Sequence, residues 1–193
     1  MTHRIAVIQG HPDVSPCHLG HALADAYISG AIEKGHQVRE VVVAEIDFPI
    51  VRSKAEWELD DVPESIRLAQ DTIRWASHVL ILHPLWLGSM PALLKAFLEQ
   101  VFRPGFALTR RDGRWERLLR GRSAHVVVTM GMPALVFRWF FFAHGVRSLV
   151  RNVLRISGFS PVRTTLVGSV ENAGNRHRQK WLTRMRREGQ FAR

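Results

Sequence analysis

The stretch that decides the fold runs from residue 77 to residue 102 and reads SHVLILH at 77–83, PLWLGSMP at 84–91 and ALLKAFLEQVF at 92–102. The first part has the length and apolarity of a buried strand, and the last part is a helix with Leu94, Phe97 and Val101 on one face. The connection is apolar and contains Trp86, whereas an ordinary linker is polar. We interpret it as a pocket wall for a flat aromatic ligand at the end of a parallel strand.

Four more strand-like segments alternate with helical patterns on either side of this stretch. The strands are expected at 4–9, 38–43, 124–129 and 162–167, and helices at about 19–31, after Pro63, from about 134 to Gly158, and from Ala173 to about Glu188. Asp112-Gly113 between two short arms predicts a hairpin excursion near 106–118. Alternation of strands and helices predicts an α/β, flavodoxin-like, five-stranded parallel sheet of order 2-1-3-4-5 with helices on both faces.

Length and composition fit one domain that spans residues 1–193. The chain is 46% hydrophobic and 23% charged, which is typical of a globular protein. A single cysteine, Cys17, excludes an intrachain disulfide and suits a reducing compartment. We find no signal-peptide pattern and no apolar run long enough to cross a bilayer, so we expect a cytoplasmic location.

Positive charge is concentrated in two segments. Residues 176–193 carry a net +6 and residues 103–122 a net +5, whereas the rest of the chain has a net charge of −1. The basic C-terminal helix and tail, about 173–193, is therefore interpreted as a solvated face or as a surface that attracts anions. No nucleic-acid-binding signature accompanies it, and we expect no nucleic-acid partner. Peripheral contact with a membrane protein or another acidic surface remains open.

The order 2-1-3-4-5 places ligands beyond the carboxyl ends of the strands, at the switch point beside the first strand. The loops 10–20, 84–90 and 129–137 should therefore lie together. The first loop leads to the amino end of a helix, where free N–H groups favour a phosphate.

With these loops considered together, the chain resembles the flavodoxin-like NAD(P)H:quinone oxidoreductases, the family that includes modulator-of-drug-activity proteins and potassium-efflux ancillary reductases. The likeness rests on Gly10-His11-Pro12, on residues 84–95, on Val101-Phe102-Arg103-Pro104-Gly105-Phe106 and on Thr129-Met130-Gly131. It implies FAD or FMN as cofactor, NAD(P)H as co-substrate, a small quinone or similar acceptor, and a homodimer.

Transferred residue by residue, the resemblance implies a set of cofactor-binding positions and one catalytic position. The cofactor-binding residues are His11, Ser15, Leu19, Gly20, Pro84, Leu85, Trp86, Leu87, Thr129, Met130, Gly131, Met132 and Phe137. His144 is the candidate catalytic residue, near the position of the family's histidine but not in strict register with it. Leu19-Gly20 replaces a Phe-Asn pair of many relatives, and Phe137 lacks the hydroxyl of the matching tyrosine.

We therefore interpret the protein as a flavoenzyme. In this interpretation NAD(P)H reduces the flavin and leaves before a quinone or similar acceptor takes the electrons. Two alternatives stay open, a flavin-binding ancillary subunit of a membrane transporter and a non-enzymatic electron carrier. His11, His18 and His21 could be imagined as metal ligands, but we find no carboxylate partner for them in the sequence and expect no metal. The aromatic run at 137–142 could meet a membrane or a quinone, but we interpret it as dimer contact or core packing.

Overall fold

The protein is described from a computed structural model that covers residues 2–15, 17–59, 61–172 and 174–192. Its main sheet has five parallel strands in the order β2-β1-β3-β6-β7. They are β1 (Arg4–Gln9), β2 (Gln37–Val42), β3 (His78–Pro84), β6 (Ser123–Thr129) and β7 (Val162–Val167). Counted without the hairpin, this is the expected order 2-1-3-4-5, so the fold prediction is confirmed.

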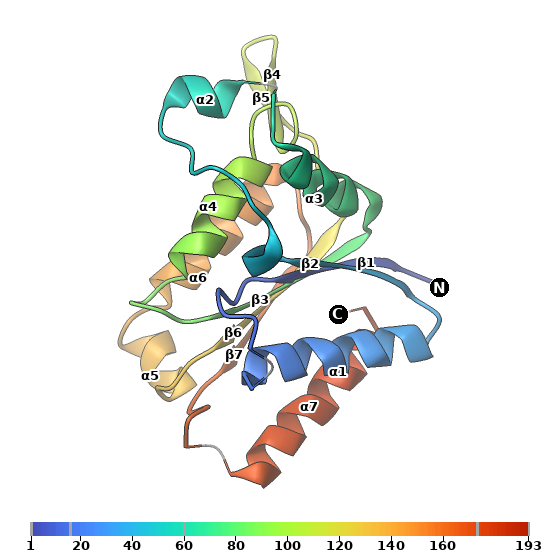
Figure 1. Cartoon of the computed structure of the whole chain (residues 1–193), viewed down its shortest axis with the longest axis vertical. Helices are drawn as coiled ribbons and strands as arrows, with labels where there is room; N and C mark the ends of the chain where they lie inside the picture. The colour runs from blue at the N-terminus through green and yellow to red at the C-terminus, as the bar shows by residue number, and fades with distance from the viewer. Residues whose placement is uncertain (1, 16, 60, 173, 193) are drawn as a thin grey trace.

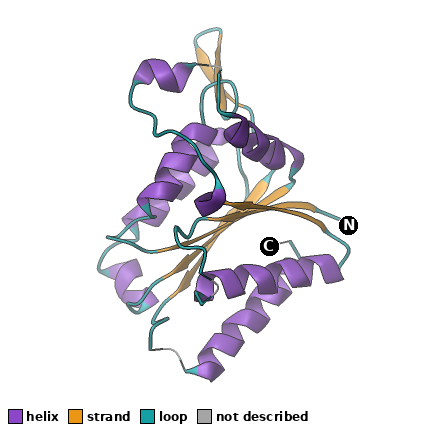
Figure 2. Cartoon of the chain, in the orientation of Figure 1, coloured by secondary structure: helices purple, strands orange, loops and turns teal. Residues whose placement is uncertain are grey.

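Helices cover both faces of the sheet (Figures 1 and 2). One face carries α1 (Leu19–Glu33) and α7 (Asn175–Gln190), and the other carries α3 (Glu64–Trp75), α4 (Ala92–Val101), α6 (His144–Ser148) and the π-helical segment η2 (Leu149–Arg155). Three further helical elements are short: η1 (Val43–Glu45), α2 (Lys54–Glu58) and α5 (Ala134–Trp139). Residues 173 and 193, the ends of the expected basic tail, lie outside the described residues.

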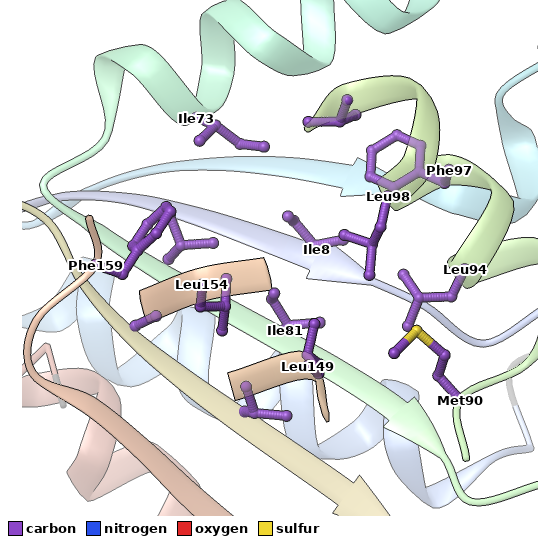
Figure 3. Close-up of a cluster of buried hydrophobic side chains, with 14 of the residues drawn as sticks. Ile8, Ile73, Ile81, Met90, Leu94, Phe97, Leu98, Leu149, Leu154 and Phe159 are labelled. Carbon is purple, nitrogen blue, oxygen red and sulfur yellow. The ribbon is translucent and has the colours of Figure 1, made fainter. Parts of the chain in front are cut away.

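Two apolar layers hold the helices to the sheet. In the larger layer, Ile8 and Ile81 project from the central strands toward Phe97 of α4 (Figure 3). The smaller layer joins strand residues such as Ile5 and Leu80 to α1 and α7. Because the central strands are buried on both faces, they read in the sequence as continuous apolar runs rather than as alternating ones.

The hairpin is confirmed as a separate two-stranded sheet, β4 (Leu108–Arg111) and β5 (Arg114–Arg117), joined at Asp112-Gly113. Both turn residues have positive φ, 50° and 76°, as a two-residue hairpin turn requires. The hairpin projects away from the main sheet at one end of the molecule (Figure 1).

One expectation was wrong: the stretch from Ala134 to Gly158 is not one continuous helix. It is broken into α5, α6 and η2, and Phe142 and Ala143 adopt left-handed backbone conformations between the first two. The break redirects the chain so that Gly145 reaches the loop after β3, where a Cβ on Gly145 would lie 2.5 Å from the Gly88 carbonyl oxygen. The apolar periodicity does not reveal this contact.

Candidate functional site

The site lies at the carboxyl ends of β1, β3 and β6, where three loops meet. The second and third loops are joined by a 2.7 Å hydrogen bond from the Leu85 N–H to the Thr129 carbonyl. The first and second loops meet where the His11 ring stands edge-on to the Trp86 ring, with centroids 6.2 Å apart. Convergence of these loops, expected from the sheet order, is therefore observed.

The first loop is organised around Asp13, which our sequence analysis missed. The Oδ1 of Asp13 accepts hydrogen bonds from the Ser15 N–H (2.8 Å) and the Ser15 hydroxyl (2.6 Å), and its Oδ2 lies 2.8 Å from the Nε2 of His18. These bonds, that from the Ser15 hydroxyl first, lower the pKa of Asp13. The hydroxyl of Ser15, which was expected to bind the cofactor, is thus engaged within the loop. An Asx turn from Asp13 to Ser15 is the signal that could have shown this.

Three imidazoles surround this turn. His11 stacks on His18 with centroids 4.0 Å apart, and His21 Nε2 lies 2.9 Å from the Asp13 carbonyl oxygen. Burial, followed by the charge of His18, lowers the pKa of His11. Among the described residues, no group of three His, Cys, Asp or Glu side chains is arranged to hold a metal ion. The carboxylate partner thought to be missing from the histidine cluster is Asp13.

The first turn of α1 adjoins the histidine cluster. Leu19 and Gly20 begin the helix, His18 is the N-cap residue, and no side chain caps the turn. A Cβ on Gly20 would meet no atom within 4 Å, so the surface beside it is open. Uncapped N–H groups at a helix start provide hydrogen-bond donors and a positive dipole for an anion.

The second loop presents an apolar, half-exposed surface. The Trp86 N–H donates to the Ser89 carbonyl and the Ser89 N–H to the Trp86 carbonyl, both at 2.9 Å, which closes a tight turn over Leu87 and Gly88. Leu87 has φ 47° and a fully exposed side chain, and the Trp86 side chain is 50% exposed. A leucine in the left-handed region is costly, and such outliers cluster at functional sites.

These turn hydrogen bonds reduce the number of backbone N–H groups in the second loop that are free to contact a ligand. Pro84 has no N–H, and the N–H groups of Leu85 and Trp86 are used internally. Among the hydrogen bonds of the described residues, the Leu87 N–H has no acceptor and is left for a ligand.

The third loop is held tightly against the segment after β7. The Met130 N–H donates to the Val167 carbonyl, the Val170 N–H donates to the Met130 carbonyl, and the Ser169 N–H donates to the Met132 carbonyl at 3.0 Å. Gly131 is exposed, and a Cβ there would lie 2.9 Å from the Glu171 carboxylate. Thr129 and Met130 are buried. A ligand at this edge would therefore contact the exposed backbone around Gly131.

The two remaining candidates differ in position. Phe137 is 1% exposed and packs in the larger core, so the structure gives its ring a packing role rather than a cofactor contact. His144 is exposed beside Gly145, which packs against Gly88 and Ser89. The structure thus brings His144, but not the Phe137 side chain, to the rim of the second loop.

Comparison with known proteins fits this geometry. A family model described as flavodoxin-like fold matches residues 3–188. The chain belongs to the flavodoxin-like family. An uncharacterized NAD(P)H oxidoreductase of Haemophilus influenzae is 25% identical over 180 residues, which cover 91% of this chain and 89% of that protein. The resemblance to NAD(P)H oxidoreductases inferred from the loops is confirmed.

Solved structures with low identity support the fold of this flavodoxin-like chain. An NAD(P)H:quinone oxidoreductase from Methanothermobacter marburgensis superposes with a TM-score of 0.83, 22% identity and coverage of 98% of this chain and 96% of the other. An FMN-dependent NADH-azoreductase from Bacillus anthracis, in complex with FMN, gives a TM-score of 0.77 with 12% identity and full coverage of both chains.

Proposed function

We propose that this protein is a flavin-dependent NAD(P)H oxidoreductase that reduces a quinone or a similar small acceptor. The observation that carries the proposal is the meeting of an uncapped helix start, the exposed Trp86-Leu87 turn and the Gly131 loop at the switch point of the sheet. The names of the relatives support the activity class.

The described residues fit a flavin by the chemistry of each loop. The first turn of α1 and the neighbouring imidazoles would hold a phosphate, since both offer donors to an anion. Trp86 and Leu87 would cover the aromatic ring, and the Leu87 N–H would donate to a ring heteroatom. The chemistry that a bound flavin supplies is hydride acceptance from NAD(P)H followed by electron delivery to an acceptor.

The remaining residues position the reactants. The exposed rim formed by Leu87 and His144 leaves one stacking face, which nicotinamide and acceptor would occupy in turn. The His144 imidazole would donate a hydrogen bond from its ring N–H to an acceptor oxygen, which stabilises the negative charge that develops there. No other protein acid is required, because the cofactor performs the redox step.

The cofactor form depends on space beside α1. A cavity of about 300 Å³ adjoins the first turn of that helix, between Leu19 and Arg178 of α7. This cavity offers room that FMN would not need and that the adenosine half of FAD would, and Arg178 would be the residue available there to hold an additional phosphate. We therefore expect Arg178→Glu to lower affinity for FAD more than affinity for FMN if FAD is the resident cofactor.

Purified protein loaded with flavin should oxidise NADH or NADPH with menadione as acceptor. Trp86→Ala should lower flavin affinity by about tenfold, because the loss of one aromatic stacking partner costs roughly 1–1.5 kcal/mol. Trp115→Ala, a change of the same size in the hairpin, should have no such effect. A negligible rate at full flavin occupancy would reject the enzyme proposal.

A further inference from the structure

A second cavity, of about 560 Å³, lies at the outer edge of the sheet rather than at the three loops. Its floor is β7, one wall is formed by α6 and η2, and the other by Trp181 and Arg184 of α7. Nothing in the proposed redox chemistry uses it.

The floor of this groove offers unpaired backbone groups. Within the described part of the chain, β7 pairs only with β6. The carbonyls of Pro161 and Val167 accept from the Ala124 and Met130 N–H groups, each at 2.9 Å, so the odd-numbered residues of β7 face inward. Because backbone direction alternates along a strand, Val162, Thr164 and Leu166 direct their N–H and C=O groups outward. These three residues line the cavity.

The wall opposite α7 carries a row of positive charge. Arg147, Arg151 and Arg155 follow one another four residues apart and all line the groove. No described carboxylate lies within ion-pair distance of any of them. Like charges at this spacing repel one another and destabilise a helix. A ligand that neutralises the row would therefore relieve an electrostatic repulsion that is present in the free protein.

The same wall contains a second unusual feature. The segment Leu149–Arg155, which holds two of these arginines, is π-helical. π-helical turns are rare and occur frequently at functional sites. On the facing wall, the Arg184 guanidinium lies 5.0 Å from the centre of the Trp181 ring, so this side combines an apolar plane with charge.

We propose that this groove binds an extended, acidic segment of a partner protein, which adds as a strand to the edge of β7. Outward backbone groups would give the affinity, as in other complexes formed by strand addition, and the arginine row would select acidic side chains on one face of the added strand. A second copy of this chain is the wrong occupant, because a twofold contact at this face would bring two positively charged grooves together. A flat membrane surface does not reach the floor of a recessed groove.

The test uses the full chain and a fluorescein-labelled peptide of alternating glutamate and valine, with fluorescence anisotropy as the readout of binding. The same peptide with glutamine for glutamate is the control. We expect Arg151→Glu to weaken binding by about tenfold, as for one partly exposed charge pair made repulsive. Arg176→Glu, an equal charge change on an exposed part of α7 outside the groove, should bind as the unmodified protein does. Arg151→Gln checks the result if the charge reversal impairs folding.

Amide hydrogen exchange separates strand addition from simple charge attraction. Bound peptide should slow exchange at Val162, Thr164 and Leu166. Absence of peptide binding would overturn the proposal. Binding without protection of these amides, equal competition by tripolyphosphate, or capture of phosphatidylglycerol vesicles in place of the peptide would also overturn it.

Discussion

His83 is enclosed at the end of β3, directly before the loop that covers the site. Its Nδ1 lies 2.9 Å from the Pro84 carbonyl oxygen, while its Nε2 is buried with no partner among the described residues. Burial lowers the pKa of His83 to about 4, although the Pro84 bond opposes the shift. The imidazole is therefore neutral in the folded protein at pH values where the unfolded chain is already protonated.

We predict that the free energy of unfolding falls as the pH drops from about 6.5 to about 4, by up to about 1.4 kcal/mol per pH unit from this residue. The sign follows because the unfolded state binds the proton more tightly in this window, and the contribution is constant above it. Urea unfolding at pH 7, 6 and 5 should show His83→Leu losing less stability than the unmodified protein. Equal losses in the two proteins would contradict the assignment.

Leu87 combines a left-handed backbone with a fully exposed side chain, so its replacement loses no packing. Leu87→Asn creates the Asn-Gly pair that this type of turn favours and should raise stability by about 0.5–1 kcal/mol. The same change removes the apolar cover expected over the flavin, so flavin affinity should fall. Thermal unfolding of the flavin-free protein and a flavin titration test both effects. A variant that binds flavin as tightly as before would show that Leu87 is not a cofactor contact.

At the scale of elements, α1 and α7 approach so closely that two glycines are required between them. A Cβ on Gly30 would lie 2.0 Å from the Arg186 carbonyl oxygen, and one on Gly189 would lie 2.0 Å from the Tyr27 carbonyl oxygen. Across the same contact, Arg186 pairs with Glu33. The basic helix α7 is thus docked against α1 at Gly189, and its arginines are exposed, with Arg186 paired across the contact.

Gly30→Ala should therefore destabilise the protein by about 1–3 kcal/mol, even though alanine is the better helix former, because the two backbones must move apart. Gly20→Ala is the matched control: it lies in the same helix with open space beside it and should not destabilise the fold. Denaturant midpoints of both variants measure the difference. Equal stabilities would show that the helices can separate without cost.

The sequence predicted elements better than it predicted contacts. The ends of each strand of the main sheet were predicted to within one residue, because a buried strand appears in the sequence as a continuous apolar run. The engagement of Ser15 by Asp13, the break at Phe142 and the Gly30 contact were not foreseen. These features depend on which segments lie next to each other in the folded protein, and the periodicity of apolar residues does not predict such contacts.

At the scale of the whole molecule, the exposed aromatic residues around α5 suggest a contact surface for a second copy of the chain. Trp139 and Phe140 are 72% and 74% exposed, so the expected core packing is limited to Phe137 within this run. Within the described part of the chain, no helix is long and apolar enough to span a membrane. We propose that these exposed aromatic side chains form the contact of a homodimer in which the partner closes the pocket.

Trp139→Ser combined with Phe140→Ser should convert a dimer to a monomer, since aromatic anchors at the centre of an interface dominate its stability. Sedimentation velocity measures the change, and Leu68→Ser, an exposed apolar position on α3, is the control. A protein that is monomeric before mutation would contradict the dimer proposal and leave the patch unexplained.

The central claim is that the three loops hold a flavin, and the most direct measurement is the flavin content of the purified protein. Visible absorption and mass analysis of the material released on denaturation give the amount and the identity of the cofactor. We predict one FMN or FAD per chain, or full uptake when either is added. A colourless protein that binds neither flavin would contradict the account.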